Sequence, residues 1–370
     1  MTKRKYMFLT AIVFVVILGI LVCIHELGHF TVARWIGVHV EEFGFGLPPR
    51  IWGKKIGKTI YSLNWLPIGG FVKLAGEDEA NIEHKGKVKD QSTYFWARSK
   101  KERAAILLAG VAMNFMLAVG ITTYLLNQGV FEPSGRVHVE KVAAGSPAEL
   151  AGLQKDDVVL SAQLEAKADI AVTIRKPADL IVFTNAHRGE KILLTVARGS
   201  DVLVTPLTPR TEVPAGQGPM GVAVSDLEKH IYPLSQAPVE ALKVNAKRSV
   251  EMFTGLADTV AKLVQRKPVG SDVAGPIGIA QVTGQAVKFG FNAVLEFMSI
   301  LSLNLAVLNI LPIPALDGGR LMFIVIEKLT GRKVNSAFER TSHQIGMVLL
   351  MLLVVLISIN DIMRLARGGS

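Results

Sequence analysis

The chain has 370 residues, half of them apolar, and a positive mean hydropathy of +0.37. Charged residues make up 19%, below the roughly 25% typical of soluble domains, and the apolar residues gather in blocks, which indicates a membrane protein. The net charge of +10 comes without a nucleic-acid-binding motif, so we expect no nucleic acid partner. The single cysteine excludes an internal disulfide.

Four apolar blocks approach the roughly 20 residues that a helix needs to cross a bilayer, namely 7–24, 104–126, 291–311 and 345–359. The first follows three basic residues, as a signal peptide would. No small-residue cleavage site comes after it, which favours a membrane span. We therefore expect about four transmembrane helices.

Lys and Arg in short loops set the expected orientation, because they are enriched on the cytoplasmic side. Segment 34–103 carries 13 of them, and 320–340 carries five. Both segments are therefore expected in the cytoplasm, and 127–290 outside it. The basic residues at 3–5 predict the opposite orientation, with the N-terminus in the cytoplasm.

Residues 25–29 read His-Glu-Leu-Gly-His, directly after the first apolar block. Two histidines four apart share a helical face, so both imidazoles can bind one zinc ion. Glu26 lies beside them, where it can take a proton from water whose pKa zinc lowers to about 7. The alternative is two ordinary histidines at a helix end. Ionisable groups within a span are costly and usually functional, which favours the metal site.

Catalytic zinc usually has three protein ligands, so another segment should supply a third. Asp317 is the best candidate, as the only acid between Glu296 and Glu327. Pro312 and Pro314 break the helix before it, and irregular backbone at membrane depth occurs only where protein or a water-filled cavity covers it. The residues alone leave a zinc ligand and a polar Asp-Gly turn equally open.

The segment 127–290 has soluble character. Residues 136–142 and 191–197 alternate like strands, and 146–149 is typical of a capped helix start. The run VEKVAAGSPAELAGLQKDDVVL resembles a bacterial PDZ domain, a class that binds extended peptide ends by strand addition. The alternative is another small α+β domain. Residues 238–264 have helical spacing and suit either a helix on the outer membrane surface or a linker.

The whole pattern resembles the site-2 protease family of intramembrane zinc metalloproteases, the peptidase M50 type, and within it the RseP-like regulators of sigma-E protease with a single PDZ domain. HELGH (25–29) and NILPIPALDGG (309–319) match its two signatures. FGFGLPPRIW (43–52), YSLNWLPIGGFVKLAGE (61–77) and AGPIGIA (274–280) also match the group. In the second span the family usually has Ala-Gly-Pro-x-x-Asn, whereas this chain has Val111 in place of the proline.

The resemblance implies a zinc metalloendopeptidase with one Zn²⁺ per chain, in which His25, His29 and Asp317 are the metal ligands and Glu26 is the catalytic base. Asn309 matches the family's asparagine near the substrate backbone, and Asn304 is a further candidate for substrate binding.

The implied partners are single-pass membrane proteins already trimmed by another protease, such as anti-sigma factors, and remnant signal peptides. A peptide ligand of the PDZ domain is a further expectation. The implied activity is regulated intramembrane proteolysis in the bacterial inner (plasma) membrane, with the active site near the cytoplasmic side and the PDZ domain extracytoplasmic. The competing functions are a non-catalytic membrane adaptor and a metal transporter.

We thus expect a polytopic α-helical membrane protein with a membrane-associated β-strand loop and an inserted α+β PDZ domain. The expected segments are 1–33, the first transmembrane helix with the metal motif; 34–103, a cytoplasmic loop with β-strands; 104–127, the second transmembrane helix; 128–215, the extracytoplasmic PDZ domain; 216–290, an extracytoplasmic connector with an amphipathic helix; 291–319, the third transmembrane helix with the Leu-Asp-Gly motif; 320–342, a cytoplasmic loop; and 343–370, the fourth transmembrane helix and C-terminal tail.

The 34–103 segment adds a hypothesis about the substrate. Residues 59–65 alternate like a strand, with glycines at 69 and 70. Because a protease needs an extended peptide, an edge strand near the active site would pair with unwound substrate.

Overall fold

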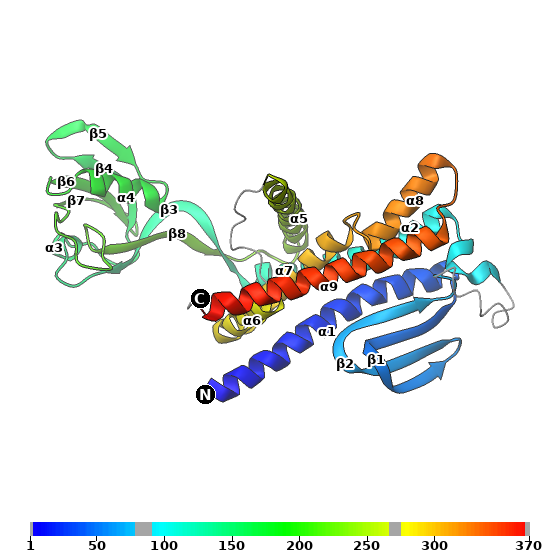
Figure 1. The fold of residues 1–370 in the computed structure, drawn as a ribbon. Helices are drawn as coiled ribbons and strands as arrows, with labels where there is room; N and C mark the ends of the chain where they lie inside the picture. Colours follow the sequence, from blue (N-terminus) through cyan, green and yellow to red (C-terminus); the bar gives the residue numbers. More distant parts are fainter. Residues whose placement is uncertain (1–2, 78–90, 266–274, 367–370) are drawn as a thin grey trace. The chain divides into compact units, whose positions relative to one another are not determined.

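The computed structural model describes residues 3–77, 91–265 and 275–366 (Figure 1). Ala274, the first residue of the AGPIGIA match, lies outside these ranges. The chain divides into two compact units. Unit 1 contains Met1–Leu125 and Pro233–Ser370, and unit 2 is Leu126–Tyr232.

Among the described residues of unit 1, four helices contain stretches long and apolar enough to cross a membrane, which confirms the expected number. They are α1 (Lys3–Ile36), α2 (Lys100–Gln128), α7 (Phe291–Asn309) and α9 (Ser336–Ala366). A helix satisfies its own backbone hydrogen bonds, as a segment in hydrocarbon must. Large apolar side chains remain exposed along α9, which suits contact with lipid.

The predicted third segment, 291–319, is not one helix. After α7 ends, two prolines interrupt the helical hydrogen bonding, and α8 (Asp317–Thr330) begins with the predicted zinc ligand. The intervening bend is tight, because a Cβ built on Gly318 would lie 2.1 Å from the carbonyl oxygen of Leu311. The other two α-helices in the described part of unit 1 are α5 (Ala237–Val264), which contains the whole predicted 238–264 helix, and α6 (Pro276–Phe289).

The segment between α1 and α2 forms an antiparallel hairpin of β1 (Val40–Ile56) and β2 (Thr59–Leu74), followed by two 3-10 turns, η2 (Gln91–Thr93) and η3 (Phe95–Ala97). Each of the two long strands of the hairpin has two halves, and both halves of β2 pair with the first half of β1. Phe43 of β1 pairs with both Tyr61 and Val72, so the first half of β1 lies between the two halves of β2. The second half of β2, 70–74, is therefore an outer strand of this sheet.

Two apolar clusters flank the middle of α1. Ile17 and Leu21 pack with Ile121 of α2 and Met298 of α7. Farther along α1, Ala33 belongs to a second cluster that joins the hairpin, α2 and α8. The two predicted histidine ligands lie between these clusters, so both sides of the motif are fixed by buried packing.

Unit 2 is a six-stranded antiparallel sheet in the order β7-β6-β4-β3-β8, with β5 paired to β4 (Figure 1). Its core includes side chains from the strands and both helices. Unit 2 continues to Tyr232, beyond the expected 128–215 segment, because β8 pairs with β3. The elements are β3 (Val130–Val142), α3 (Pro147–Leu150), β4 (Val158–Leu164), β5 (Lys167–Thr173), α4 (Pro177–Ala186), β6 (Ile192–Arg198), β7 (Asp201–Leu207) and β8 (Val222–His230).

The predicted helix start at 146–149 forms with a modified cap. The Ser146 hydroxyl accepts a hydrogen bond from the Glu149 N–H at 3.1 Å. The Glu149 carboxylate accepts from the N–H of Gly145 at 2.6 Å, one residue before the capping position. The bond to Ser146 satisfies one of the backbone donors that a helix start leaves unpaired, and the bond to Glu149 fixes the residue before the cap.

Candidate active site

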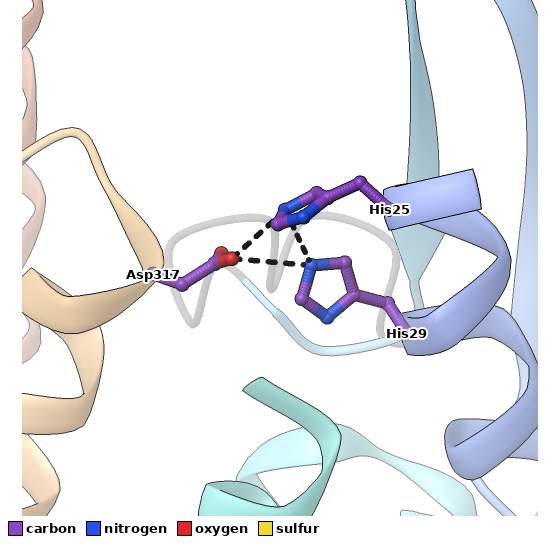
Figure 2. A group of neighbouring side chains, drawn as sticks. All are labelled: His25, His29 and Asp317. Atoms are coloured by element: carbon purple, nitrogen blue, oxygen red, sulfur yellow. Dashed lines mark hydrogen bonds and ion pairs between the residues drawn. The ribbon is translucent and has the colours of Figure 1, made fainter. Parts of the chain in front are cut away.

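His25 and His29 lie one turn apart on α1, and Asp317 lies at the first position of α8. Figure 2 shows the three side chains converging. The Nε2 atoms of the histidines are 3.2 Å apart, and Asp317 Oδ2 lies 3.0 Å from His25 Nε2 and 3.3 Å from His29 Nε2. Both imidazoles are buried. The bend before α8 therefore brings together the three residues that the sequence predicted as ligands.

A buried partner on α2 fixes each imidazole from behind. His29 Nδ1 donates a hydrogen bond to the carbonyl oxygen of Ile106 at 2.8 Å, which leaves the Nε2 lone pair facing the cluster. The side-chain amide of Asn114 lies 3.2 Å from His25 Nδ1 and is fully buried. The amide atom nearest to Nδ1 is Nδ2. A flip of the amide would turn its oxygen toward Nδ1–H, and His25 would then take the same tautomer as His29. No sequence pattern points to Ile106, because its backbone carbonyl makes the contact, and Asn114 stands out only as part of the second-span motif.

Two glycines let α1 and α2 approach closely enough for these contacts. A Cβ built on Gly28 would lie 2.4 Å from the carbonyl oxygen of Ala109. One built on Gly110 would lie 2.4 Å from His29 Nε2 and 2.8 Å from His25 Cε1. The space that the imidazoles occupy therefore depends on the absence of a side chain at 110.

The spacing of the ligand atoms suits zinc. Zinc bonds of about 2.0–2.1 Å at tetrahedral angles place neighbouring ligand atoms roughly 3.3 Å apart, close to the separations of the three atoms here. Two histidines and one carboxylate also form a ligand set used by catalytic zinc. Asp317 Oδ2 is buried and, within the described ranges, accepts no hydrogen bond of good geometry, so it is available to a cation.

Glu26 borders a cavity of about 400 Å³ that His29 and Asp317 also line. Its carboxylate interacts with the backbone N–H of Val72 in the outer strand of the hairpin. A Cβ on Gly70 would lie 3.6 Å from Glu26 Cγ, so this strand passes directly beside the glutamate. The arrangement puts the Glu26 carboxylate, His29 and Asp317 of the three-residue cluster, and a strand edge around one cavity.

The far side of the cavity carries charged and polar groups. Arg320 of α8 forms an ion pair with Glu77, just after β2. His343 of α9 accepts a hydrogen bond at Nδ1 from the backbone N–H of Ala315, at 2.9 Å. All four residues line the cavity. No sequence pattern singles out His343, because it lies in the last span, remote from both signatures.

The two asparagines expected near the substrate differ in position. Asn309 is the last residue of α7, and it lines a small gap together with Asp317. Asn304 lies earlier on α7, and the described contacts do not join it to the cluster. Substrate binding by either residue stays a prediction.

The sequence profile of one peptidase family, M50, matches this chain over residues 13–353. The chain belongs to peptidase family M50. As an M50 peptidase it is a zinc metalloprotease, and its four apolar helices agree with a multi-pass membrane protein.

Relatives of this M50 peptidase cover almost its whole length. A Clostridium perfringens protein, named as a candidate zinc metalloprotease, is 33% identical over 92% of this chain and 95% of its own. The Bacillus subtilis regulator of sigma-W protease RasP is 28% identical over 96% of this chain and 99% of its own. The zinc metalloprotease RasP of Bacillus licheniformis shows the same identity and coverage.

Proposed function

We propose that this chain is an intramembrane endopeptidase in which His25, His29 and Asp317 hold one zinc ion and Glu26 is the general base. The observation that carries the proposal is the convergence of three ligand atoms beside a cavity that Glu26 also lines. The same four residues were singled out from the two sequence signatures.

A zinc ion in this site supplies a Lewis acid for the scissile carbonyl and for water. Glu26 accepts a proton from the attacking water and passes it to the departing amine. One C–O bond forms and the peptide C–N bond breaks. Ile106 and Asn114 keep the two imidazoles oriented toward the metal throughout.

We further propose that the substrate binds as an extended strand along 70–74. The first half of β1 pairs with this segment on one side, and the N–H of Val72 faces Glu26 on the other. A peptide added at that edge would run past the catalytic base with its backbone exposed.

Proline at 72 tests this strand. Val72→Pro removes an N–H at the substrate edge, while Val72→Ala keeps it and is the matched control. We expect cleavage to be lost in the first and retained in the second, with zinc bound in both. Equal cleavage by the two variants would rule out strand addition at this edge.

The proposed substrates are single-pass membrane proteins pre-trimmed by another protease, such as anti-sigma factors, and remnant signal peptides. The name of the Bacillus subtilis relative, a regulator of sigma-W protease, supports the first class. The location proposed is the bacterial plasma membrane. The basic residues of 34–103 and 320–340 support an active site near the cytoplasm and an extracytoplasmic unit 2.

Unit 2 is proposed to act as the expected PDZ domain. A groove of about 410 Å³ lies between α4 and β8, lined by apolar side chains that include Leu180, Met220 and Val224. In the sheet order, β8 is a terminal strand, so it can accept a further strand. Fluorescence titration of full-length protein with labelled peptides tests this role. Ile181→Glu, at an exposed residue that also lines the groove, should weaken peptide binding, whereas Leu203→Glu, on β7, should not.

Cleavage of a panel of trimmed, tagged single-pass substrates in membranes tests the protease assignment. We expect wild type to cleave and Glu26→Gln to bind zinc without cleaving. Glu296→Gln is the control, because that side chain is exposed on α7. If zinc is bound but the wild type cleaves no member of the panel, the adaptor function replaces the proposed one.

A further inference from the structure

Ala315 has an unusual backbone conformation two residues before Asp317. Its φ is +83°, and among the described residues other than glycine only Asp156 shares a positive φ. An L-residue with a side chain is disfavoured in this region. Such a conformation persists only when its surroundings hold it.

The last span, α9, supplies that restraint. His343 Nδ1 accepts the hydrogen bond of the Ala315 N–H at 2.9 Å. One turn farther along α9, Gly346 allows close approach, because a Cβ there would lie 2.5 Å from the carbonyl oxygen of Pro314. The imidazole of His343 also packs edge-on against buried Phe323 of α8, with ring centroids 5.9 Å apart. The His343 ring that accepts the Ala315 hydrogen bond is thus itself fixed by packing against Phe323.

The restrained turn leads directly into the proposed zinc ligand. The N–H of Leu316 bonds to the carbonyl oxygen of Ile313 at 3.1 Å, and that of Gly319 to the oxygen of Leu316 at 3.1 Å. These bonds join the turn at Ala315 to the first turn of α8. The direction of the Asp317 carboxylate therefore follows from the conformation at 315.

We propose that His343 is a positioning residue of the zinc site: through the Ala315 N–H it holds the left-handed turn that aims Asp317 at the two histidines. The proposal rests on the proposed function, in which Asp317 is a zinc ligand. It gives the fourth span a part in assembling the active site, although that span contributes neither a ligand nor the base.

Zinc titration of the full-length protein in detergent, with cleavage kinetics alongside, tests this role. His343→Ala should weaken zinc binding by about 10-fold, within the range typical of residues that orient ligands, and lower kcat with little change in KM. His343→Asn, whose side-chain oxygen can accept the same hydrogen bond, should recover most of the loss. Gln344→Ala, exposed on the next position of α9, is the matched control.

A second-site change isolates the path through Ala315. Glycine takes a positive φ without the penalty of a side chain, so Ala315→Gly should restore zinc affinity to His343→Ala and do little by itself. Wild-type affinity in His343→Ala would overturn the proposal. So would a loss that neither His343→Asn nor Ala315→Gly repairs, because His343 would then act by another route.

Asp317→Asn, measured in parallel, distinguishes a failure of the proposed zinc site from a failure of the positioning role of His343. If Asp317→Asn binds zinc as tightly as the wild type, Asp317 is not a ligand and the proposed function loses its metal site. If Asp317→Asn loses zinc while His343→Ala keeps it, the site stands and only the positioning role fails.

Discussion

Replacement of Gly110 by alanine should impair the zinc site without a change in any ligand. The added Cβ would lie 2.4 Å from His29 Nε2, and a real Cβ essentially never comes nearer than 3.0 Å to such an atom. One of the two groups must therefore move by about 0.6 Å. Zinc–ligand distances vary by only about 0.2 Å.

The imidazole cannot move away freely. His29 Nδ1 is bonded to the Ile106 carbonyl, and His25 Cε1 lies 2.8 Å from the same added atom. We expect zinc affinity to fall by about 10- to 100-fold, the loss that follows when ligand orientation is disturbed. This corresponds to about 1.4–2.7 kcal/mol.

Competition with a fluorescent zinc chelator, on purified protein in detergent, measures the change. Gly120→Ala is the matched control, since it lies on the same helix and its added Cβ would meet nothing within 4 Å. That control should keep zinc affinity and gain up to about 1 kcal/mol of helix stability. If Gly110→Ala bound zinc as tightly as Gly120→Ala, the close packing of α2 against the imidazoles would not be needed for the site.

Three further outcomes are expected. Asn114→Leu should lower zinc affinity about 10-fold, because it removes the polar partner of His25 Nδ1, and Asn114→Asp should restore it in the same titration. Removal of zinc with a chelator should abolish substrate cleavage, and added zinc should restore it in wild type but not in Glu26→Gln. The Arg198 guanidinium, hydrogen-bonded to both carboxylate oxygens, and the Gln154 N–H hold the pKa of Asp157 below its usual value. Their stabilisation of unit 2 is complete above the unfolded pKa of about 3.9 and is lost as pH falls through the folded pKa. Denaturant unfolding of a 126–232 fragment should detect that loss, and Arg198→Ala should lower the unfolding midpoint at pH 7; an unchanged midpoint in this variant would show that the ion pair does not stabilise unit 2.

The chemistry of the site was easier to predict than its surroundings. His25, Glu26 and His29 could be predicted as a group because helical spacing alone puts both imidazoles on one face. Asp317 could not be assigned from the residues without the family resemblance, since its position depends on a bend 292 residues away in sequence from His25. The contact of Asn114 with His25 depends on the packing of α2 against α1, and no local sequence pattern predicts that packing.

The strand pairing of the two sheets could not be predicted from the sequence pattern either. Alternation at 59–65 predicted a strand, but not that the first half of β1 would pair with both halves of β2. The length of unit 2 was underestimated for a similar reason. β8 pairs with β3 although residues 143–221 lie between them in the chain, and alternation within one strand does not identify its partner.

The separation of the proposed ligands along the chain has a consequence for biosynthesis. At translation rates of about 5–20 residues per second, Asp317 is made roughly 15–60 s after His25. Until then, the first histidine pair has no third protein ligand. Tight metal loading must therefore wait until α8 has emerged and docked, so a growing or truncated chain carries the peptidase motif without a complete peptidase. The order of synthesis itself delays the activity until α8 has been made.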